Sequence, residues 1–222
     1  MDDHIKLNEA ENVHSSLVGL TVDYMTRFTI GAAVEDAFKI SLLGAEVINQ
    51  TTYARKLLGK VRCLDDTSLT AACKLSGYDV CFRAGIMGYR PVEEISPDIQ
   101  TIANIRTMVN RGVEFFKQYG PIVKDGFTFE GGYTNLVSSG DGDFLTQDTL
   151  WDFKVSNKGP TNAHTLQLLM YYLMGIHSEH KEFENIKQLG VFNPRLNNIY
   201  LLEISDISSD TINEVSKEVI GY

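Results

Sequence analysis

Residues 139–156 read SGDGDFLTQDTLWDFKVS. Apolar and polar residues alternate on both sides of a short turn, a pattern that predicts two consecutive antiparallel strands. Asp152 and Lys154 are two residues apart on the second strand, so their side chains point to the same face, whereas Phe153 points to the other face and can enter the core. Charged side chains on both sides of one apolar strand residue are costly unless they are exposed, paired or bound to metal.

Asp143 lies on the preceding strand and is expected opposite Asp152 across the ladder. The stretch therefore predicts that two carboxylates and one amine converge on one point. Such a trio suits phosphodiester hydrolysis. Asp143 and Asp152 supply hard oxygen ligands for Mg²⁺ or Mn²⁺, and the metal lowers the pKa of a bound water. Lys154 is expected to orient or deprotonate that water, or to neutralise charge that develops on the phosphate.

An acidic residue on one strand followed by D/E-x-K on the next resembles the PD-(D/E)XK nuclease superfamily, here as Asp143 and then Asp152-Phe153-Lys154. Gly140 and Asp143 are similar to the G-x-x-D that opens the motif in the RecB-like exonuclease branch. The resemblance implies a restriction-endonuclease-like core and a metal-dependent nuclease, and it favours DNA over RNA as the expected substrate. It also implies a metal held by Asp143, Asp152 and the backbone carbonyl of Phe153.

Two further matches belong to the same branch. Gln167 and Tyr171 share one helix face and look like its Q-x-x-x-Y motif, which implies that both residues support the site or touch the nucleic-acid backbone. Upstream, residues 30–38 are similar to the G-x-x-x-H/E segment of the first helix, which offers Glu35 as another metal ligand. Glutamate in place of histidine fits an all-oxygen site for Mg²⁺.

The rest of the chain predicts helices and strands in an ordered succession. Apolar residues at helical spacing indicate a long helix from near Gly31 to about Asn49. Another helix starts at residues 96–98, where Pro97 suits the first turn, and ends near Tyr119. Later segments are strands at 127–134, 136–145 and 149–155, a helix at about 162–176, a strand near 199–203 and a last helix at about 209–219. This order predicts an α/β fold with a mixed sheet, an antiparallel strand meander and flanking helices.

The 222 residues, 43% of them hydrophobic, are expected to form a single domain. Residues 1–125 would be a mostly helical elaboration that includes the first core helix, and residues 126–222 the catalytic core. The acidic opening at Asp2 and Asp3 does not resemble a secretory signal, and no apolar run reaches the length of a membrane span. We therefore expect a soluble, cytoplasmic protein without membrane contact.

The net charge of −9 disfavours broad electrostatic affinity for nucleic acid. It does not exclude a nuclease, because a metal site concentrates carboxylates and bound cations invert the local field. Nucleic acid is therefore the expected partner, and a protein partner or a homo-oligomer are further candidates. Some relatives hold an iron–sulfur cluster through four cysteines, a number that Cys63, Cys73 and Cys81 cannot supply. We predict no such cluster.

Simpler interpretations stay open at this stage. Asp143, Asp152 and Lys154 could form a cross-strand ion pair on an exposed face. A second functional hypothesis is the same fold with a weakened site, acting as a protein-binding or nucleic-acid-binding module. Glu35 is also explained by the preference for acidic residues in a first helical turn. His164 is expected to be a polar helix residue without a role in the site.

Overall fold

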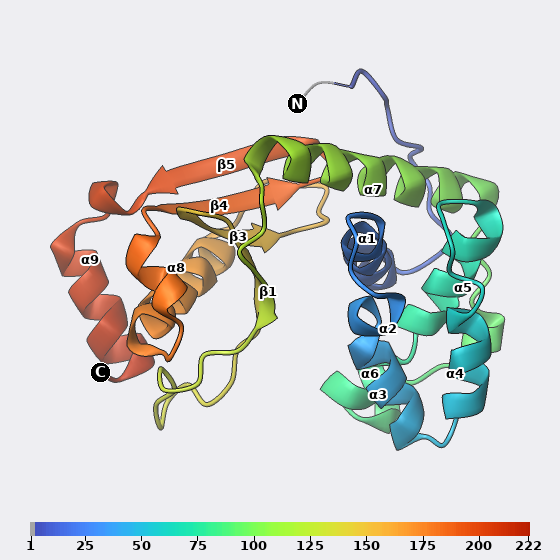
Figure 1. The fold of residues 1–222 in the computed structure, drawn as a ribbon, viewed down its shortest axis with the longest axis horizontal. Coiled ribbons are helices and arrows are strands. Elements are labelled where there is room, and N and C mark those ends of the chain that lie inside the picture. Colours follow the sequence, from blue (N-terminus) through green and yellow to red (C-terminus); the bar gives the residue numbers. More distant parts are fainter. Residues whose placement is uncertain (1–2) are drawn as a thin grey trace. The chain divides into compact units, whose positions relative to one another are not determined.

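The structure of the protein, a computed structural model, describes residues 3–222. The chain divides into two compact units between Glu114 and Phe115 (Figure 1). We call residues 3–114 the helical unit and Phe115–Tyr222 the sheet unit. The division falls within helix α7 (Ile99–Tyr119), whose last residues belong to the sheet unit. None of the helices in residues 3–222 combines the length and the apolar character needed to cross a bilayer.

The helical unit packs short amphipathic helices around buried apolar side chains, among them Val22, Met25 and Leu69. Its helices before α7 are α1 (Ser15–Thr29), α2 (Val34–Ala37), α3 (Lys39–Val47), α4 (Thr51–Leu58), α5 (Asp66–Ser76) and α6 (Asp79–Arg83). Two short 3₁₀ turns follow, Ile86–Gly88 and Val92–Glu94. Asp98 then starts α7 by accepting a hydrogen bond from the backbone N–H of Thr101 (2.8 Å).

The predicted single helix from Gly31 to Asn49 is wrong. Gly31 adopts a φ of +115°, a conformation that L side chains rarely adopt, and it lies after the end of the unpredicted helix α1. Phe38 then interrupts the segment, because its φ of −104° and ψ of 20° depart from helical values and separate α2 from α3. Phe38 is fully buried and stacks edge-on against Tyr24, so tertiary packing overrides the local helical pattern here.

A buried carboxylate joins three helices of this unit. Asp79 of α6 is 1% exposed and accepts hydrogen bonds from the hydroxyls of Tyr24 in α1 and Ser41 in α3. Arg83 lies 3.7 Å from the same carboxylate. Burial raises the pKa of Asp79 above its ordinary value of 3.8, although the two hydroxyls and Arg83 oppose this effect. The network holds α1, α3 and α6 together through one side chain.

Asp79→Ala should lower the free energy of unfolding of the helical unit by about 3–5 kcal/mol, because it leaves buried hydroxyls and a nearby arginine without their acceptor. Asp79→Asn should cost less, since its amide replaces part of the network. The raised pKa means that the stability linked to this ionisation is fully present below about pH 3.8 and is lost as pH rises through the folded-state pKa. Urea unfolding across this range should therefore show a flatter pH dependence for Asp79→Asn. A loss in Asp79→Ala no greater than that in Glu46→Ala, an exposed site on α3, would contradict the assignment.

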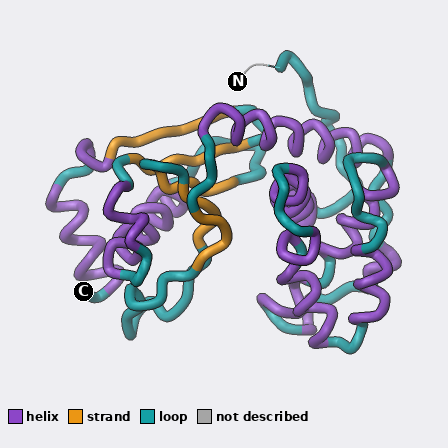
Figure 2. The backbone as a smooth tube through the Cα atoms, in the orientation of Figure 1, coloured by secondary structure: helices purple, strands orange, loops and turns teal. Residues whose placement is uncertain are grey.

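The sheet unit is built on one five-stranded mixed sheet with the strand order β1-β2-β3-β4-β5 (Figure 2). The strands are β1 (Lys124–Phe127), β2 (Gly142–Leu145), β3 (Thr149–Phe153), β4 (Gln188–Asn193) and β5 (Asn198–Glu203). The first three strands are antiparallel neighbours. Helix α8 (Asn162–His177) then connects β3 to β4, and these two strands are parallel. Strand β5 pairs with β4 in the antiparallel direction.

Helices cover both faces of this sheet. Leu145 and Leu150 point to one face, where they pack in a cluster with Leu168, Leu169 and Leu173 of α8. The same cluster includes residues of the C-terminal segment, helix α9 (Ser209–Glu214) with the π-helical turn Val215–Ile220. The other face is aromatic: Phe115 from the end of α7 packs with Phe144, Trp151 and Phe192. The structure thus confirms the predicted α/β class, with a mixed sheet flanked by helices.

Individual elements differ in how well the sequence predicted them. Helices α7 and α8, strands β3 and β5 and the last helix lie close to the predicted bounds. The strand predicted at 136–145 forms over its last four residues as β2, whereas the strand predicted at 127–134 overlaps β1 at Phe127 alone. Residues 128–141 form a loop instead, in which Tyr133 donates to the carbonyl of Gly140 (3.1 Å) and accepts from the backbone N–H of Phe129 (2.9 Å). Strand β4 was missed. It is buried on both faces, so its sequence lacks the alternation of a half-exposed strand.

Candidate active site

The candidate site lies where β2 and β3 face α8. Phe144 pairs with Trp151 in the antiparallel register, and an extension of this register by one residue brings Asp143 opposite Asp152. Side chains alternate between faces, and both aspartates therefore lie on the side of Leu145 and Leu150, which is the side that α8 covers. The register thus places two carboxylates next to each other at the end of the hairpin.

Lys154 follows directly after β3, on the same side as Asp152. Its backbone N–H donates to the carbonyl of Phe192 in β4 (3.0 Å), which extends the parallel pairing beyond the strand. Its Nζ lies 2.9 Å from Oδ1 of Asp152, whose side chain is 7% exposed. Burial by itself would lower the pKa of Lys154, but the charge and hydrogen bond of Asp152 and the charge of Asp143 outweigh burial and raise it. Lys154 is therefore an ammonium held between two carboxylates.

Asp143 is held by the backbone of the neighbouring strand. Its Oδ2 accepts a hydrogen bond of 2.7 Å from the backbone N–H of Phe153. The ring of Phe153 lies on the opposite face, against Phe144 and Phe192. The residue between Asp152 and Lys154 therefore anchors the strand in the aromatic core on one face and orients Asp143 through its backbone on the other.

Helix α8 adds two polar side chains to this group. Lys154 donates through Nζ to Oε1 of Gln167 (3.3 Å), and Nε2 of Gln167 donates to the hydroxyl of Tyr171 (2.9 Å). Burial raises the pKa of Tyr171, and the charge of Asp143 contributes to the increase, whereas hydrogen bonds from Gln167 and from the backbone of Asp141 lower it. A continuous chain of contacts thus runs from Asp152 through Lys154 and Gln167 to Tyr171 and the loop before β2.

The sequence places Gln167 and Tyr171 by simple helical geometry. Thr161 and His164 form a reciprocal capping box at the start of α8. Gln167 and Tyr171 are four residues apart, so they share one helix face. Leu168, which lies between these two residues in the sequence, is buried and faces the core. His164 has the structural role of a helix cap, in agreement with the interpretation of it as a residue outside the site.

Gly140 allows the loop before β2 to approach this helix closely. A Cβ atom at Gly140 would lie 3.2 Å from Cε1 of Tyr171 and 3.4 Å from Cε of Met174. A side chain at this position would therefore require Tyr171 to shift by a few tenths of an ångström. The close approach to Tyr171 thus explains why a glycine suits the first position of the G-x-x-D pattern.

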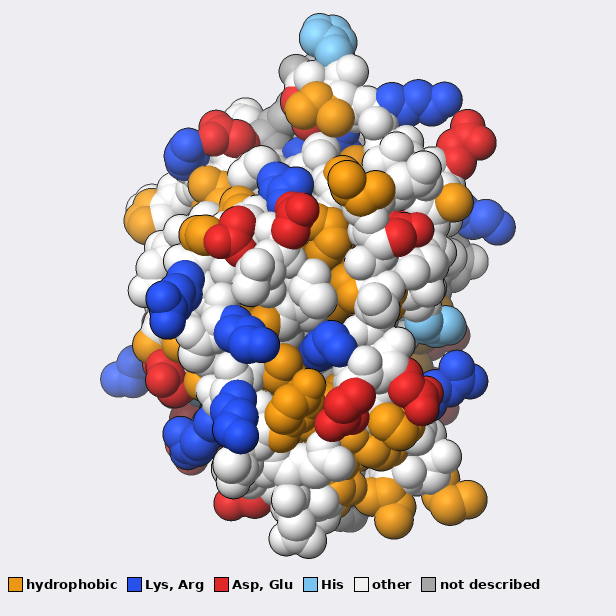
Figure 3. Space-filling model, turned by 90° about the vertical axis from the view of Figure 1, so that its right-hand side faces the viewer, with side chains coloured by type: hydrophobic (Ala, Val, Ile, Leu, Met, Phe, Trp, Pro, Cys, Tyr) orange, Lys and Arg blue, Asp and Glu red, His pale blue; other side chains and the backbone are white. Residues whose placement is uncertain are grey.

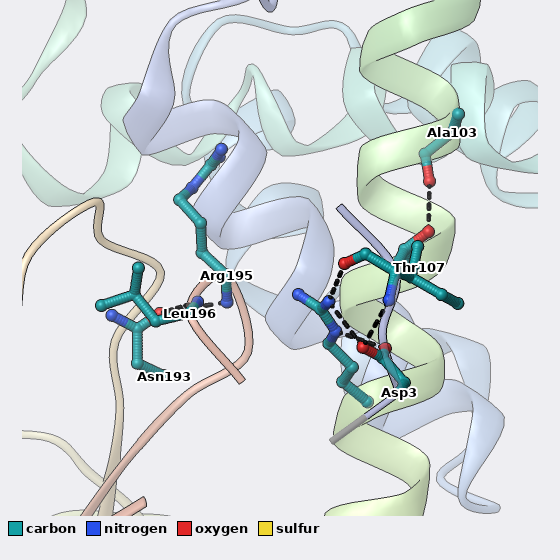
Figure 4. A network of polar contacts seen from close by, with 8 residues as sticks. Asp3, Ala103, Thr107, Asn193, Arg195 and Leu196 are labelled. Atoms are coloured by element: carbon teal, nitrogen blue, oxygen red, sulfur yellow. Dashed lines mark hydrogen bonds and ion pairs between the residues drawn. The ribbon is translucent and has the colours of Figure 1, made fainter. Parts of the chain in front are cut away.

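Sequence reasoning missed the residue that organises the loops beside the site. Asn193, at the end of β4, is 1% exposed. Its Nδ2 donates to the carbonyls of Ser156 (2.8 Å) and Lys158 (3.2 Å). Its Oδ1 accepts from the backbone N–H groups of Arg195 (3.0 Å) and Leu196 (3.3 Å) (Figure 4). One buried amide therefore ties the segment after Lys154 to the β4–β5 turn. Its only sequence signal was the turn pattern Asn-Pro.

Asn193→Ala should lower the free energy of unfolding of the sheet unit by about 2–4 kcal/mol, because several buried backbone groups lose their partner together. We also expect faster amide hydrogen exchange at Arg195 and Leu196, which the side chain holds directly. Asn198→Ala, at an exposed position at the start of β5, is the matched control and should change stability little. Equal stability of the two variants would show that Asn193 does not organise these loops.

Glu35 lies in the other unit. It is exposed in the first turn of α2, in the helical unit, whereas Asp143, Asp152, Lys154, Gln167 and Tyr171 all belong to the sheet unit. The short helix favours an acidic residue at this position without any metal. The proposed role of Glu35 as a metal ligand stays a prediction.

The donor set at the site is hard and oxygen-rich. Among residues 3–222 the structure gathers no group of three or more His, Cys, Asp or Glu side chains that could hold a metal ion. A cation at this site would accordingly depend on the two carboxylates together with backbone oxygen, water or substrate. That set fits Mg²⁺ or Mn²⁺, because Mg²⁺ is commonly bound through one or two carboxylates and keeps several waters. Comparisons with protein-family models, curated proteins and solved structures gave no match to this chain.

Proposed function

We propose that this chain is a Mg²⁺- or Mn²⁺-dependent nuclease that hydrolyses phosphodiester bonds in DNA, with a RecB-like site of the PD-(D/E)XK type. The observation that carries the proposal is the contact chain in which Lys154 bonds to Asp152 and to Gln167, with Asp143 beside them. This arrangement brings two carboxylates, an ammonium and the amide of a helix residue together. It suits metal-dependent hydrolysis of a phosphodiester bond. A surface ion pair would need neither the amide nor the burial of Asp152.

The order of elements around the site supports the same proposal. The elements follow in the order α7, β1, β2, β3, α8 and β4. The three strands after α7 are antiparallel, and β4, which follows α8, is parallel to β3. The resemblance to PD-(D/E)XK nucleases implies acidic residues on two adjacent strands of a mixed sheet, followed by a helix with the Gln and Tyr residues. Asp143 on β2, Asp152 on β3 and Gln167 on α8 occupy these places.

Each side chain has a defined task in this proposal. A divalent cation, when bound, supplies a Lewis acid for the scissile phosphate and its attacking water. Asp143 and Asp152 hold it, and the backbone N–H of Phe153 keeps the carboxylate of Asp143 in place. Lys154 places a positive charge where negative charge develops on the phosphate. Gln167 positions Lys154, and Tyr171 positions Gln167.

A second candidate function is a binding module with the same fold and a weakened site. The short contact between Lys154 and Asp152 favours it, because this pair neutralises the charge of the carboxylate without a metal. The net charge of −9 favours it as well. The two candidates differ in whether a divalent cation binds and whether the nucleic acid is cut.

The test incubates the protein with linear duplex, circular duplex and single-stranded DNA, and with RNA, in the presence of Mg²⁺, Mn²⁺ or EDTA. We expect metal-dependent cleavage that EDTA abolishes, and circular substrates distinguish an endonuclease from an exonuclease. Thermal unfolding should also shift upward with Mn²⁺, because a ligand at 100 times its Kd stabilises the folded state by about 2.7 kcal/mol. Absence of both cleavage and stabilisation would favour the binding module.

A further inference from the structure

The helical unit carries a dense group of positive charges on an otherwise acidic chain. Arg55, Lys56, Lys60 and Arg62, which we call the basic segment, are all exposed. No acidic residue occurs between Glu46 and Asp65. The basic segment therefore has a local charge opposite to that of the protein as a whole.

The fold presents these four residues rigidly. Ala54, Leu57, Leu58 and Val61 alternate with them and are buried, at 5% exposure or less. Past the end of α4 the chain stays coiled, because the backbone N–H of Lys60 donates to Leu57 (2.9 Å) and that of Val61 to Leu58 (2.9 Å). An α-helical turn rises about 1.5 Å per residue and a 3₁₀-type turn about 2 Å, so residues 55–62 span roughly 10–14 Å along the coil. The four basic residues form one compact patch.

The charges of the basic segment are not neutralised by carboxylates. Other arginines of the helical unit pair with aspartate, as in Arg27–Asp23, Arg83–Asp79, Arg106–Asp66 and Arg111–Asp3. Within residues 3–222 no ion pair joins a residue of the basic segment to an acidic side chain. The nearby Asp65 instead accepts from the backbone N–H of Ser68 (2.7 Å) and caps α5. Figure 3, which views the side on which Figure 1 draws α4, shows Lys and Arg side chains gathered on this surface.

The helix macrodipole explains only part of this arrangement. Cations are favoured near a helix C-terminus, but the effect falls off within the last turn. Arg55 and Lys56 lie in the last turn of α4, and Nε of Arg62 donates to the carbonyl of its C-cap residue Gly59 (3.1 Å). Lys60 lies beyond the final residue of the helix, Leu58. Four unneutralised cations on a chain of net charge −9 therefore indicate a function that needs positive charge at this surface.

We infer that the basic segment binds the phosphate backbone of nucleic acid. The class of ligand rests on the proposed nuclease function, whereas the location rests on charge and exposure alone. Each strand of duplex DNA carries one phosphate per about 3.4 Å of helix axis, so a patch that extends about 10 Å along this axis contacts about three of them. Arginine donors match phosphate oxygens in bidentate geometry, and Lys56 and Lys60 add point charges. Such contacts position the nucleic acid without reading its sequence.

The test measures binding of the full chain to a labelled DNA duplex by fluorescence anisotropy, in EDTA, from about 50 to 200 mM salt. The variant combines Arg55→Gln, Lys56→Gln, Lys60→Gln and Arg62→Gln. A control with the same charge change combines Lys39→Gln, Arg90→Gln, Lys181→Gln and Lys217→Gln at exposed, dispersed positions. We expect the first variant to bind at least about 10-fold more weakly at about 100 mM salt, and its slope of log K against log salt to fall by about 2.7, for three lost phosphate contacts. Circular dichroism checks that both variants are folded.

Equal weakening in the two variants would overturn the inference, because it would show a general charge effect. Absence of DNA binding by the unmodified protein at the lowest salt concentration would overturn it too, as would stronger segment-dependent binding to phosphatidylserine vesicles than to DNA. The outcomes for the nuclease function are separate. Cleavage that persists while the basic segment proves irrelevant would leave the nuclease proposal standing. Segment-dependent DNA binding by a protein that never cleaves would retain the inference and exclude hydrolysis.

Discussion

Asp152→Ala is expected to reduce metal-dependent DNA cleavage by about 10³-fold or more, which is the scale of losing a group that stabilises the transition state directly. The residue is 5% exposed and contacts Lys154 at 2.9 Å, so its removal takes away both a proposed metal ligand and the partner of the ammonium. Initial rates on the preferred DNA substrate, at saturating Mg²⁺ or Mn²⁺, measure the effect. The upward shift of thermal unfolding with Mn²⁺ should disappear in the same variant.

Asp206→Ala is the matched control for this experiment. Asp206 is an exposed aspartate of the sheet unit, remote in sequence from the strands of the site, and the variant should retain the cleavage rate. Equal cleavage by the unmodified protein and Asp152→Ala would identify the activity as a contaminant. Loss of cleavage in both variants would point to a general effect on folding, which circular dichroism detects.

Lys154→Ala should produce the second large effect, a loss of cleavage of about 10²–10⁴-fold, because the ammonium that faces the developing negative charge on the phosphate is lost. Without metal it should also lower the free energy of unfolding, since the buried carboxylate of Asp152 loses its ammonium. We expect about 2–3 kcal/mol, below the range for fully buried pairs, because the Lys154 side chain is 29% exposed. Rate measurements and urea unfolding in EDTA test the two parts separately.

A bound cation should compensate for part of this loss of stability. The increase in unfolding temperature with Mn²⁺ is therefore expected to be larger in Lys154→Ala than in the unmodified protein, because the cation replaces the missing positive charge beside Asp152. Lys181→Ala, at an exposed site of the sheet unit, should leave the rate and the metal response unchanged. An unchanged cleavage rate in Lys154→Ala would remove this residue from the proposed mechanism.

Short periodicities in the sequence predict several features of the site correctly. Side chains two apart on a strand share a face, which places Asp152 beside Lys154 and directs Phe153 to the aromatic core. Residues four apart on a helix share a face, which brings Gln167 to Tyr171. These constraints act within a few residues and hold in any tertiary context that preserves the strand or the helix.

The contacts between distant segments follow from the fold as a whole and not from any local pattern. Strand β4 pairs with β3 after the intervening helix α8, and its fully buried residues carry no alternation that would reveal it. Phe38 divides a segment with a helical pattern because it packs in the core against Tyr24, and Asn193 acquires its role from two loops that only the fold brings together. The physical reason is that hydrogen bonds and packing across long sequence separations depend on the whole arrangement, whereas a local pattern records only the periodicity of its own element.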